Sequence, residues 1–501
     1  MSTRDPISGR QWLLIILVQI VTLAFGMTIT ASNVVLPQMR GALSVTQDQI
    51  AMVVTSYLVA AAVGTPLTGW LAARLGWRRL MMGTVAGFTL SSALCGLAGS
   101  LEMLVLTRVA QGLFGAPLMP LGQGILLASF PRHMHPRVLM LWGVGGVMGP
   151  VLGPVFGGLI AESLSWRWAF FMIVPFGLVG LLLAWVALRD QVQGKAQRLD
   201  GFGFLTLAIA VGMAQLVLDR GQRLDWFEST EIVLESVTGL IAFYLFVTHS
   251  LTSRAPFLSP ALFVDRNFVL GIVLAMLMGA LAFTPVVLFP PLLQDLRDYP
   301  ETVIGYLMSA RGIGNFMSFF VVVQFTRYSA RLCLATGLVL QAIAGWAMTQ
   351  LNIDMSNLDV FWTNLLHGFG FGLSYTPMAA LAFTTLSPTL IVEGSALFNL
   401  MRNLGSSLFI SVCVLVLVRS TAQSYAGLGG VVSPFNELFH QADVAAYWST
   451  SSSVGLASIA REIQRQASMV GYLNAFHLFT LAALSAIPLA YLFRAAPREA
   501  S

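Results

Sequence analysis

The chain has 501 residues, of which 56% are hydrophobic and only 10% are charged. Soluble domains carry about 25% charged residues and cannot bury so much apolar surface. The composition therefore argues against a soluble enzyme, a nucleic-acid-binding protein and a secreted disulfide scaffold. The net charge of +5 suits a membrane protein whose basic residues gather in cytoplasmic loops. We expect an all-α protein that crosses a membrane many times.

Fourteen stretches are long and apolar enough to span a bilayer, which takes about 20 helical residues. They are continuous apolar runs rather than alternating ones, and this favours helices over strands. The seventh and eighth stretches are the weakest, because Glu231 and Glu235 lie at the edge of the eighth. The predicted spans are 12–34, 50–71, 80–99, 103–124, 138–160, 168–188, 202–218, 232–249, 268–290, 303–325, 332–350, 360–384, 395–418 and 472–492.

The basic residues are distributed unevenly between the two sets of loops. If the N-terminus is cytoplasmic, the cytoplasmic segments carry sixteen basic residues and the short loops on the other side carry five. This bias predicts that both termini are cytoplasmic. The segment 419–471 is the one sizeable piece between spans. The apolar spacing of residues 456–473 predicts a short amphipathic helix there, which leads into the last span.

The loop between the second and third spans reads GWLAARLGWRRL at residues 69–80. Two glycines permit a tight turn, and three arginines anchor the loop at the cytoplasmic surface. An ordinary positively charged loop is the alternative explanation. The pattern resembles the signature loop of the major facilitator superfamily, except that Ala73 replaces its acidic residue. The resemblance implies a gating loop that lacks the acid that helps to lock the family's closed gate. The residues of this predicted gating loop are Gly69, Arg74, Gly76, Arg78 and Arg79.

The fourth span contains Arg108 and Gln111 in the string RVAQGLFGA, which resembles the second signature of the same superfamily. A charge inside a span costs about 2.5 kcal/mol or more on insertion scales. We therefore expect Arg108 to face the bundle interior or a water-filled cavity. The alternative is an arginine that snorkels to the outer surface.

The fifth span carries two stripes of small residues in the string GVGGVMGPVLGPVFGG. Bare backbone along a helix lets a neighbour pack very closely, and the prolines are expected to kink the helix. The string resembles the motif G-x-x-x-G-P-x-x-G-G of superfamily exporters, which implies export rather than uptake. Packing alone is the other explanation. The residues of this predicted exporter motif are Gly145, Gly149, Pro150, Gly153, Pro154, Gly157 and Gly158.

Further strings extend the resemblance to nearly the whole chain. Together with LDRG and LDWF after the seventh span, WRWAFF at 166–171 and FNLMRNLGSS at 398–407 resemble the EmrB/QacA branch of drug:proton antiporters, on the side of EmrB-type multidrug exporters. The resemblance implies a major facilitator fold with two six-helix bundles and two inserted helices. The implied divisions are an N-terminal bundle at 1–190, an inserted helix pair at 191–255 and a C-terminal bundle at 256–501 with a long periplasmic loop at 419–471.

The resemblance implies a function as well as a fold. Members of the branch use the proton-motive force to export lipophilic small molecules across the bacterial inner membrane by alternating access. EmrB-like members work with a periplasmic adaptor of the EmrA type and an outer-membrane channel. Two alternatives remain open: a dedicated exporter of one metabolite such as a fatty acid or a siderophore, and a non-transporting sensor or scaffold.

No chemistry of an enzyme is visible in the sequence. There is no P-loop and no catalytic set of residues, so we expect neither enzymatic activity nor a cofactor, and no bound nucleic acid. The HMH string at 133–135 has no Cys, Asp or Glu nearby, and therefore no metal site is expected. The three cysteines, Cys95, Cys333 and Cys413, lie far apart in apolar stretches and are expected to be buried thiols.

The first span departs from the branch at the position that carries an acidic residue in the family. The family string D-x-T-I-x-N-V-A-L-P has its acid where this chain has Thr28, while Asn33 keeps its place. Proton coupling through the first span is therefore not supported.

Other polar residues inside spans could line the substrate and proton pathway, although a structural hydrogen bond explains each one equally well. We expect at least two of them to face the same cavity. The full set of predicted pathway residues is Thr28, Asn33, Arg108, Gln111, Arg311, His367, Tyr375, Asn399 and Arg402.

The arginines inside spans also predict the charge of the substrate. An unpaired buried cation is costly, so each needs a partner. If the protein supplies too few carboxylates, an anionic substrate would serve as one. This predicts a preference for neutral or weakly acidic lipophilic compounds over dications. Backbone carbonyls are the alternative partners.

Overall fold

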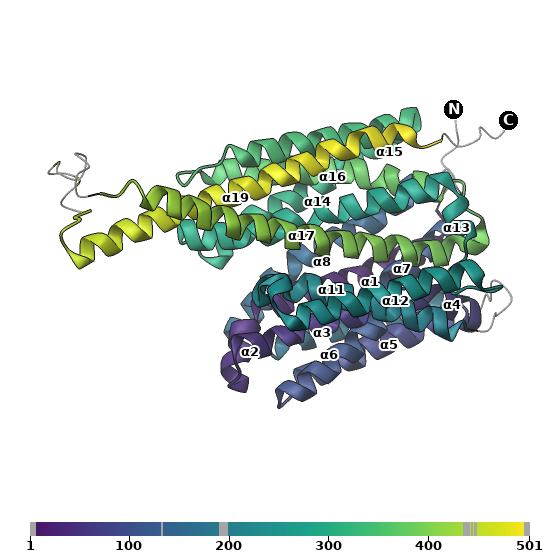
Figure 1. Ribbon diagram of the computed structural model, residues 1–501. Helices are drawn as coiled ribbons and strands as arrows, with labels where there is room; N and C mark the ends of the chain where they lie inside the picture. The colour runs from purple at the N-terminus through teal and green to yellow at the C-terminus, as the bar shows by residue number, and fades with distance from the viewer. Residues whose placement is uncertain are drawn as a thin grey trace.

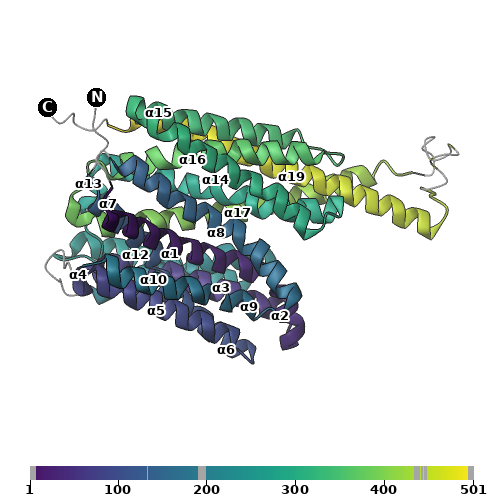
Figure 2. The same cartoon turned by 180° about the vertical axis from the view of Figure 1, so that it is seen from behind.

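The computed structural model is a bundle of long helices that run roughly alongside one another (Figures 1 and 2). The start of α1 and the end of α19 lie at the same end of the bundle (Figures 1 and 2). The backbone of Arg494 exchanges two hydrogen bonds with the side chain of Asn267, and Arg10 Nε donates to the carbonyl of Ala187 at 2.9 Å. We call this end the terminus end and the opposite one the far end. The residues that the structure describes are 7–131, 134–189, 199–433, 441, 444 and 448–494.

The first part of the chain forms ten helices whose boundaries follow from local chemistry. Ser8 and Thr46 start α1 and α3 with capping boxes, in which a glutamine three residues on bonds back to the cap. Pro66 and Pro117 stand where α4 and α7 begin, because proline lacks the N–H that an unbroken helix needs. The helices are α1 (Gly9–Val34), α2 (Leu36–Leu43), α3 (Gln47–Gly64), α4 (Leu67–Leu75), α5 (Trp77–Gly96), α6 (Leu101–Gly115), α7 (Leu118–Ser129), α8 (His135–Ser163), α9 (Trp168–Phe171) and α10 (Ile173–Ala187).

The second part is built from fewer and longer helices. Within α15 the backbone leaves the helical region at Ser329, with φ −159° and ψ 112°, so that two helical segments meet there. Short 3₁₀ turns at Gly221–Leu224 and Trp226–Glu228 join α11 to α12. The helices are α11 (Gly201–Arg220), α12 (Thr230–Thr252), α13 (Ala261–Val264), α14 (Arg266–Arg297), α15 (Glu301–Thr349), α16 (Asn357–Phe383), α17 (Ile391–Gly429) and α19 (Ser453–Leu492).

The predicted spans coincide with these helices. In the described chain, ten helical stretches are long and apolar enough to cross a membrane, or eleven if α3 and α4, bent by 58°, form one span. The stretch Val303–Thr349 covers two predicted spans, because α15 turns at Ser329. The predicted spans 80–99 and 360–384 fall on α5 and α16, which bury several Thr, Ser and Asn side chains. Each of the fourteen predicted stretches thus falls on helix.

The glycine stripe of α8 packs directly against α1. A Cβ added to Gly149 would lie 2.8 Å from the carbonyl oxygen of Leu23, and one on Gly157 would lie 3.0 Å from Ala31 Cβ. The expected kink does not interrupt the helix, because α8 runs unbroken from 135 to 163. Prolines are tolerated within spans where neighbouring helices support the backbone. Gly145 and Gly153 also face α1, whereas the side chain of Pro154 lies outside the described part.

Helices α17 and α19 project beyond the other helices at the far end (Figure 1). With 40 residues, α19 is about 60 Å long, twice the hydrocarbon thickness of a bilayer. The two helices touch at Gly471, where a Cβ would lie 2.7 Å from the carbonyl oxygen of Leu417. The predicted short amphipathic helix is therefore the first half of α19. Helix α17 likewise continues past the predicted end of the thirteenth span, to Gly429.

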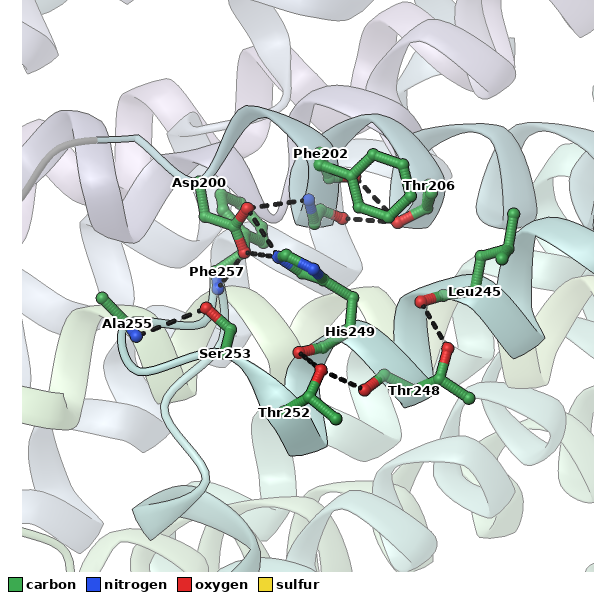
Figure 3. Close-up of polar contacts among 11 residues, drawn as sticks. Asp200, Phe202, Thr206, Leu245, Thr248, His249, Thr252, Ser253, Ala255 and Phe257 are labelled. Atoms are coloured by element: carbon green, nitrogen blue, oxygen red, sulfur yellow. Dashed lines mark hydrogen bonds and ion pairs between the residues drawn. The ribbon is translucent and has the colours of Figure 1, made fainter.

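Helices α11 and α12 lie side by side and are tied together at both ends. At the terminus end, Asp200 caps α11 and accepts a hydrogen bond from His249 Nε2 at 2.9 Å (Figure 3). At the far end, Arg220 forms ion pairs with Glu231 at 2.6 Å and with Glu235 at 3.0 Å. The pair is thus held as one unit.

Helix α11 also bonds to helices on either side of the pair. Thr55 of α3 donates to the carboxylate of Asp219. On the other side, Gln215 Nε2 donates to Ser407 Oγ of α17 at 3.0 Å. The inserted pair therefore connects α3, from the first part of the chain, with α17 from the last.

Candidate functional site

Three of the predicted pathway residues come together around α16. The guanidinium carbon of Arg311 lies 5.9 Å from the ring centroid of Phe371. Phe371 stacks on Tyr375, with centroids 5.4 Å apart and planes 15° apart. Arg402 Nη1 donates to the hydroxyl of Tyr375 at 3.2 Å. Two guanidinium groups therefore flank a stacked pair of rings. We call Arg311, Phe371, Tyr375 and Arg402 the arginine–aromatic ladder.

The ladder follows from helix geometry and close backbone contacts. Phe371 and Tyr375 are four residues apart, so their rings share one face of α16. Helix α15 brings Arg311 close, because a Cβ on Gly368 of α16 would lie 2.8 Å from the carbonyl carbon of Arg311. Helix α14 approaches Arg402 of α17 at Gly279 in the same way. Gly368 thus sets how near Arg311 comes to the rings of α16, and Gly279 sets how near α14 comes to Arg402.

The charges of the ladder have no counter-ion in the described chain. Arg311 makes no hydrogen bond there, and its Nε is buried without a partner. Arg402 bonds only to the neutral groups of Tyr375 and Asn403, and its Nε is likewise unpartnered. A cation over an aromatic ring gains about 0.5–2 kcal/mol, which does not replace an ion pair. The ladder is therefore a place that favours an anion beside an apolar surface.

A tryptophan from the first part of the chain packs against the ladder. The ring centroid of Trp142 on α8 lies 6.1 Å from that of Tyr375, and the Trp142 side chain is 2% exposed. The sequence analysis missed Trp142 and Phe371. The spacing of Phe371 four residues before Tyr375 is a signal that could have found it, and Trp142 directly precedes the small-residue stripe.

Arg108 lies in a different and closed environment. Its side chain is 0% exposed, so it does not snorkel to the surface. Its Nε donates to the carbonyl of Val53 at 3.0 Å, its Nη1 donates to Gln111 Oε1 at 2.7 Å, and its guanidinium lies 4.4 Å from the Tyr57 ring centroid. Gln111 in turn donates to Ser92 Oγ at 2.5 Å. Protein groups therefore satisfy two of the three nitrogens of Arg108, and its Nη2 is buried without a partner in the described chain.

Asn399 joins the two parts of the chain. Its Nδ2 donates to Gln123 Oε1 of α7 at 2.7 Å, and both side chains are almost fully buried. The sequence analysis named Asn399 but not Gln123, although an amide in the middle of a span is itself a signal.

The remaining pathway residues are not part of the ladder. Thr28 bonds within α1 to the carbonyl four residues earlier, and Asn33 is exposed. His367 Nε2 lies 3.0 Å from the carbonyl oxygen of Leu281, and its ring packs edge-on against Phe479. His367 therefore fixes α16 against α14 and α19.

The predicted gating loop forms α4 and the turn into α5. Gly76 has a φ of 79°, which an L side chain rarely adopts. Arg78 Nη2 donates to the carbonyl of Trp185 at 3.2 Å, and the guanidinium of Arg74 lies over Trp70. Gly69 touches α17 at Glu393, a residue that the sequence analysis did not single out.

The expectations about metal ligands and thiols concern side chains outside the ladder. His133 lies outside the described residues, while His135 Nε2 is 3.1 Å from the carbonyl oxygen of Phe130. No group of three metal-binding side chains occurs among the described residues. The three cysteines are buried free thiols, as predicted.

Comparison with known proteins gives the family. The profile of the Major Facilitator Superfamily matches residues 18–410. The chain belongs to the major facilitator superfamily. It is 30% identical to the multidrug export protein EmrB of Escherichia coli K12, over 94% of this chain and 93% of that protein. It is 31% identical to EmrB of Haemophilus influenzae, over 94% of each chain.

A third relative has a different name. The chain is 30% identical to the fatty acid resistance protein FarB of Neisseria gonorrhoeae, over 94% of this chain and 95% of that protein. These similarities confirm the resemblance to the EmrB/QacA branch. They also confirm the prediction of an all-α, multi-pass membrane protein with the major facilitator fold.

Proposed function

We propose that this protein exports lipophilic small molecules across the bacterial inner membrane, driven by the proton-motive force. The names of the relatives as multidrug export proteins support this function. The N-terminal bundle 1–190 and the C-terminal bundle 256–501 rock about the ladder, with the pair 191–255 between them. The protein is a transporter without enzymatic activity or a cofactor.

The single observation that carries the proposal is the ladder itself. Two guanidinium groups without a carboxylate partner border stacked aromatic rings. The rings are buried in this arrangement, with Phe371 7% and Tyr375 5% exposed, and in the proposed cycle the rocking of the two bundles opens them to the lipophilic body of a substrate. An ionised acid gains charge-assisted hydrogen bonds from guanidinium groups, and a dication is repelled by them. We therefore propose that neutral or weakly acidic lipophilic compounds are preferred over dications.

Transport into inverted membrane vesicles tests this proposal. A lipophilic weak acid and a lipophilic dication are compared with and without a pH gradient, in the wild type and in Arg311→Ala and Arg402→Ala. We expect gradient-dependent uptake of the acid, reduced about tenfold or more in either variant. Arg461→Ala, which removes an exposed arginine of α19, is the matched control. Robust dication transport by the wild type, or unchanged acid transport in both ladder variants, contradicts the proposal.

A dedicated exporter of one metabolite is the second candidate. The similarity to a protein named for fatty acid resistance favours it, and the weakly acidic substrate expected here includes fatty acids. A panel of chemically unrelated weak acids separates the two functions, because a dedicated exporter transports a single member. A sensor or scaffold transports none of them.

We also propose that both termini are cytoplasmic and that the projecting ends of α17 and α19 are periplasmic. The asymmetry of basic residues and the position of those ends opposite the termini (Figure 1) support this orientation. An EmrA-like adaptor and an outer-membrane channel would then be reached from the far end. Reporter fusions after residue 440 and at the C-terminus should report opposite compartments. If both fusions report the same compartment, the proposed orientation is wrong.

A further inference from the structure

At the terminus end, the start of α17 packs closely against α4 and α7 of the first part of the chain. A Cβ on Gly69 of α4 would lie 2.9 Å from Glu393 Cα and 3.0 Å from Glu393 Cβ. A Cβ on Gly124 of α7 would lie 3.1 Å from a methyl group of Val392. A side chain at Gly69 would clash with the backbone of Glu393, and one at Gly124 would crowd Val392. We call Gly69, Gly124, Val392 and Glu393 the terminus-end joint.

Glu393 is the carboxylate of this joint. One of its oxygens accepts a hydrogen bond from the backbone N–H of Ser259 at 2.6 Å, and the side chain is half-buried. Ser259 lies in the connector between α12 and α13. Two residues earlier in that connector, the N–H of Phe257 donates to Asp200 at 3.1 Å (Figure 3). The connector is thus held by one carboxylate of the inserted pair and by Glu393.

Charged groups surround the joint without neutralising Glu393. Arg74 lies over the Trp70 ring at 5.2 Å. Asp265 accepts from the N–H of Phe268 and from Thr385. None of the ion pairs in the described chain includes Glu393. The charged or titratable residues on the elements around it are Arg74 on α4, Arg254 in the connector, Asp265 and Arg266 at the start of α14, and Asp200 and His249 on the inserted pair.

Opening and closing of this joint changes the hydration of Glu393. In the closed arrangement, the backbone of Gly69 covers the base of its side chain, and one N–H is the only hydrogen-bond donor that it has in the described chain. Withdrawal from water costs the charged form of a carboxyl group far more than the neutral form. When α4 and α17 separate, water returns. A proton on Glu393 therefore binds more strongly while the joint is closed.

We propose that Glu393 exchanges the coupling proton: a proton from the far side binds to it while the joint is closed, and it releases this proton to the terminus side as the joint opens. The step is the dissociation of a carboxylic acid into a carboxylate and a proton, with no other bond made or broken. The inference rests on the proposed proton-driven export. Glu393 would give the chain a titrating group, a role that Thr28 cannot fill because its side chain carries no carboxyl group. Release into the cytoplasm is also the direction in which the proton-motive force drives protons.

The two states can be distinguished by a distance across the terminus end. Spin labels are attached at Arg189→Cys, after α10, and at Thr389→Cys, before α17, both of which are exposed. The native cysteines are buried. Distances are measured by pulsed electron spin resonance in lipid nanodiscs without substrate, from about pH 5 to about pH 9. We expect the wild type to shift toward the short distance as the pH falls, because protons favour the closed joint.

Three variants decide whether Glu393 is responsible. Glu393→Gln resembles the protonated form and should show the short distance at every pH. Glu393→Asp keeps a carboxyl group and should keep a pH dependence, which separates loss of the proton site from loss of packing. His249→Gln removes the histidine that bonds Asp200 beside the connector and should leave the wild-type profile intact. A wild-type profile in Glu393→Gln, or a profile lost in His249→Gln alone, overturns the proposal. Because no substrate is present, the result is independent of the preference for weak acids.

Discussion

The arginines inside the predicted spans of the two halves differ in how well protein groups satisfy them. Arg108 is enclosed by the Val53 carbonyl, Gln111 and the Tyr57 ring. Its Nη2 alone is buried without a partner in the described chain. Arg402 makes two longer hydrogen bonds, to the neutral groups of Tyr375 and Asn403, and leaves Nε without a partner. Arg311 makes no hydrogen bond in the described chain and lies beside the Phe371 ring. All three sit inside predicted spans, where a charge is costly.

The difference shows how to separate a structural charge from a binding charge in a membrane protein. Buried polar groups normally find hydrogen-bond partners. An arginine that bonds to protein groups holds helices together, whereas an arginine without such hydrogen-bond partners is available to bind a ligand. We therefore expect Arg108 to contribute mainly to stability and the ladder to contribute to substrate recognition.

Removing Arg108 is the change with the largest expected effect on stability. Arg108→Ala leaves Gln111 and the Val53 carbonyl without their donor and opens a cavity beside Tyr57. We expect a loss of about 3 kcal/mol in the free energy of unfolding. Thermal unfolding of the purified protein in detergent measures this as a clearly lowered midpoint. A midpoint equal to that of the wild type would place Arg108 among the binding charges and break the comparison.

Removing Arg311 should affect stability least. Arg311→Met replaces an unpaired buried charge with an apolar side chain of similar length, an exchange that is often neutral or stabilising. We expect an unchanged or raised unfolding midpoint together with a loss of weak-acid transport. The same two assays on one preparation show both effects. If Arg311→Met unfolds as early as Arg108→Ala, then Arg311 is structural and the ladder is not a binding site.

Much of the fold could be predicted from sequence, because a bilayer imposes long apolar helices. Every stretch predicted from hydropathy falls on helix, but hydropathy could not give the ends of α17 and α19. Apolar runs stop where the membrane stops, while the helices continue through Gly429 and begin at Ser453. The glycine stripe predicted close packing but not its partner, α1, because a stripe does not say which helix will face it.

Only some residues of the candidate site could be predicted from the sequence. Arg311, Tyr375 and Arg402 stand out as polar residues inside spans. Phe371 and Trp142 do not, because aromatic residues are common in apolar helices. Whether an arginine is satisfied depends on partners from distant helices, as with the Val53 carbonyl at Arg108. Such partners are set by packing and leave no local pattern.

The most direct test of the account compares a lipophilic carboxylic acid with its methyl ester. Binding of each to the purified protein is measured at a pH where the acid is ionised, in the wild type and in an Arg311→Gln, Arg402→Gln double variant. The two ligands share their apolar body and differ in charge. We predict that the wild type binds the acid at least about tenfold more tightly, or about 1.4 kcal/mol, and that the double variant binds both alike. Equal affinity of the wild type for acid and ester would contradict the claim that the ladder recognises an anion.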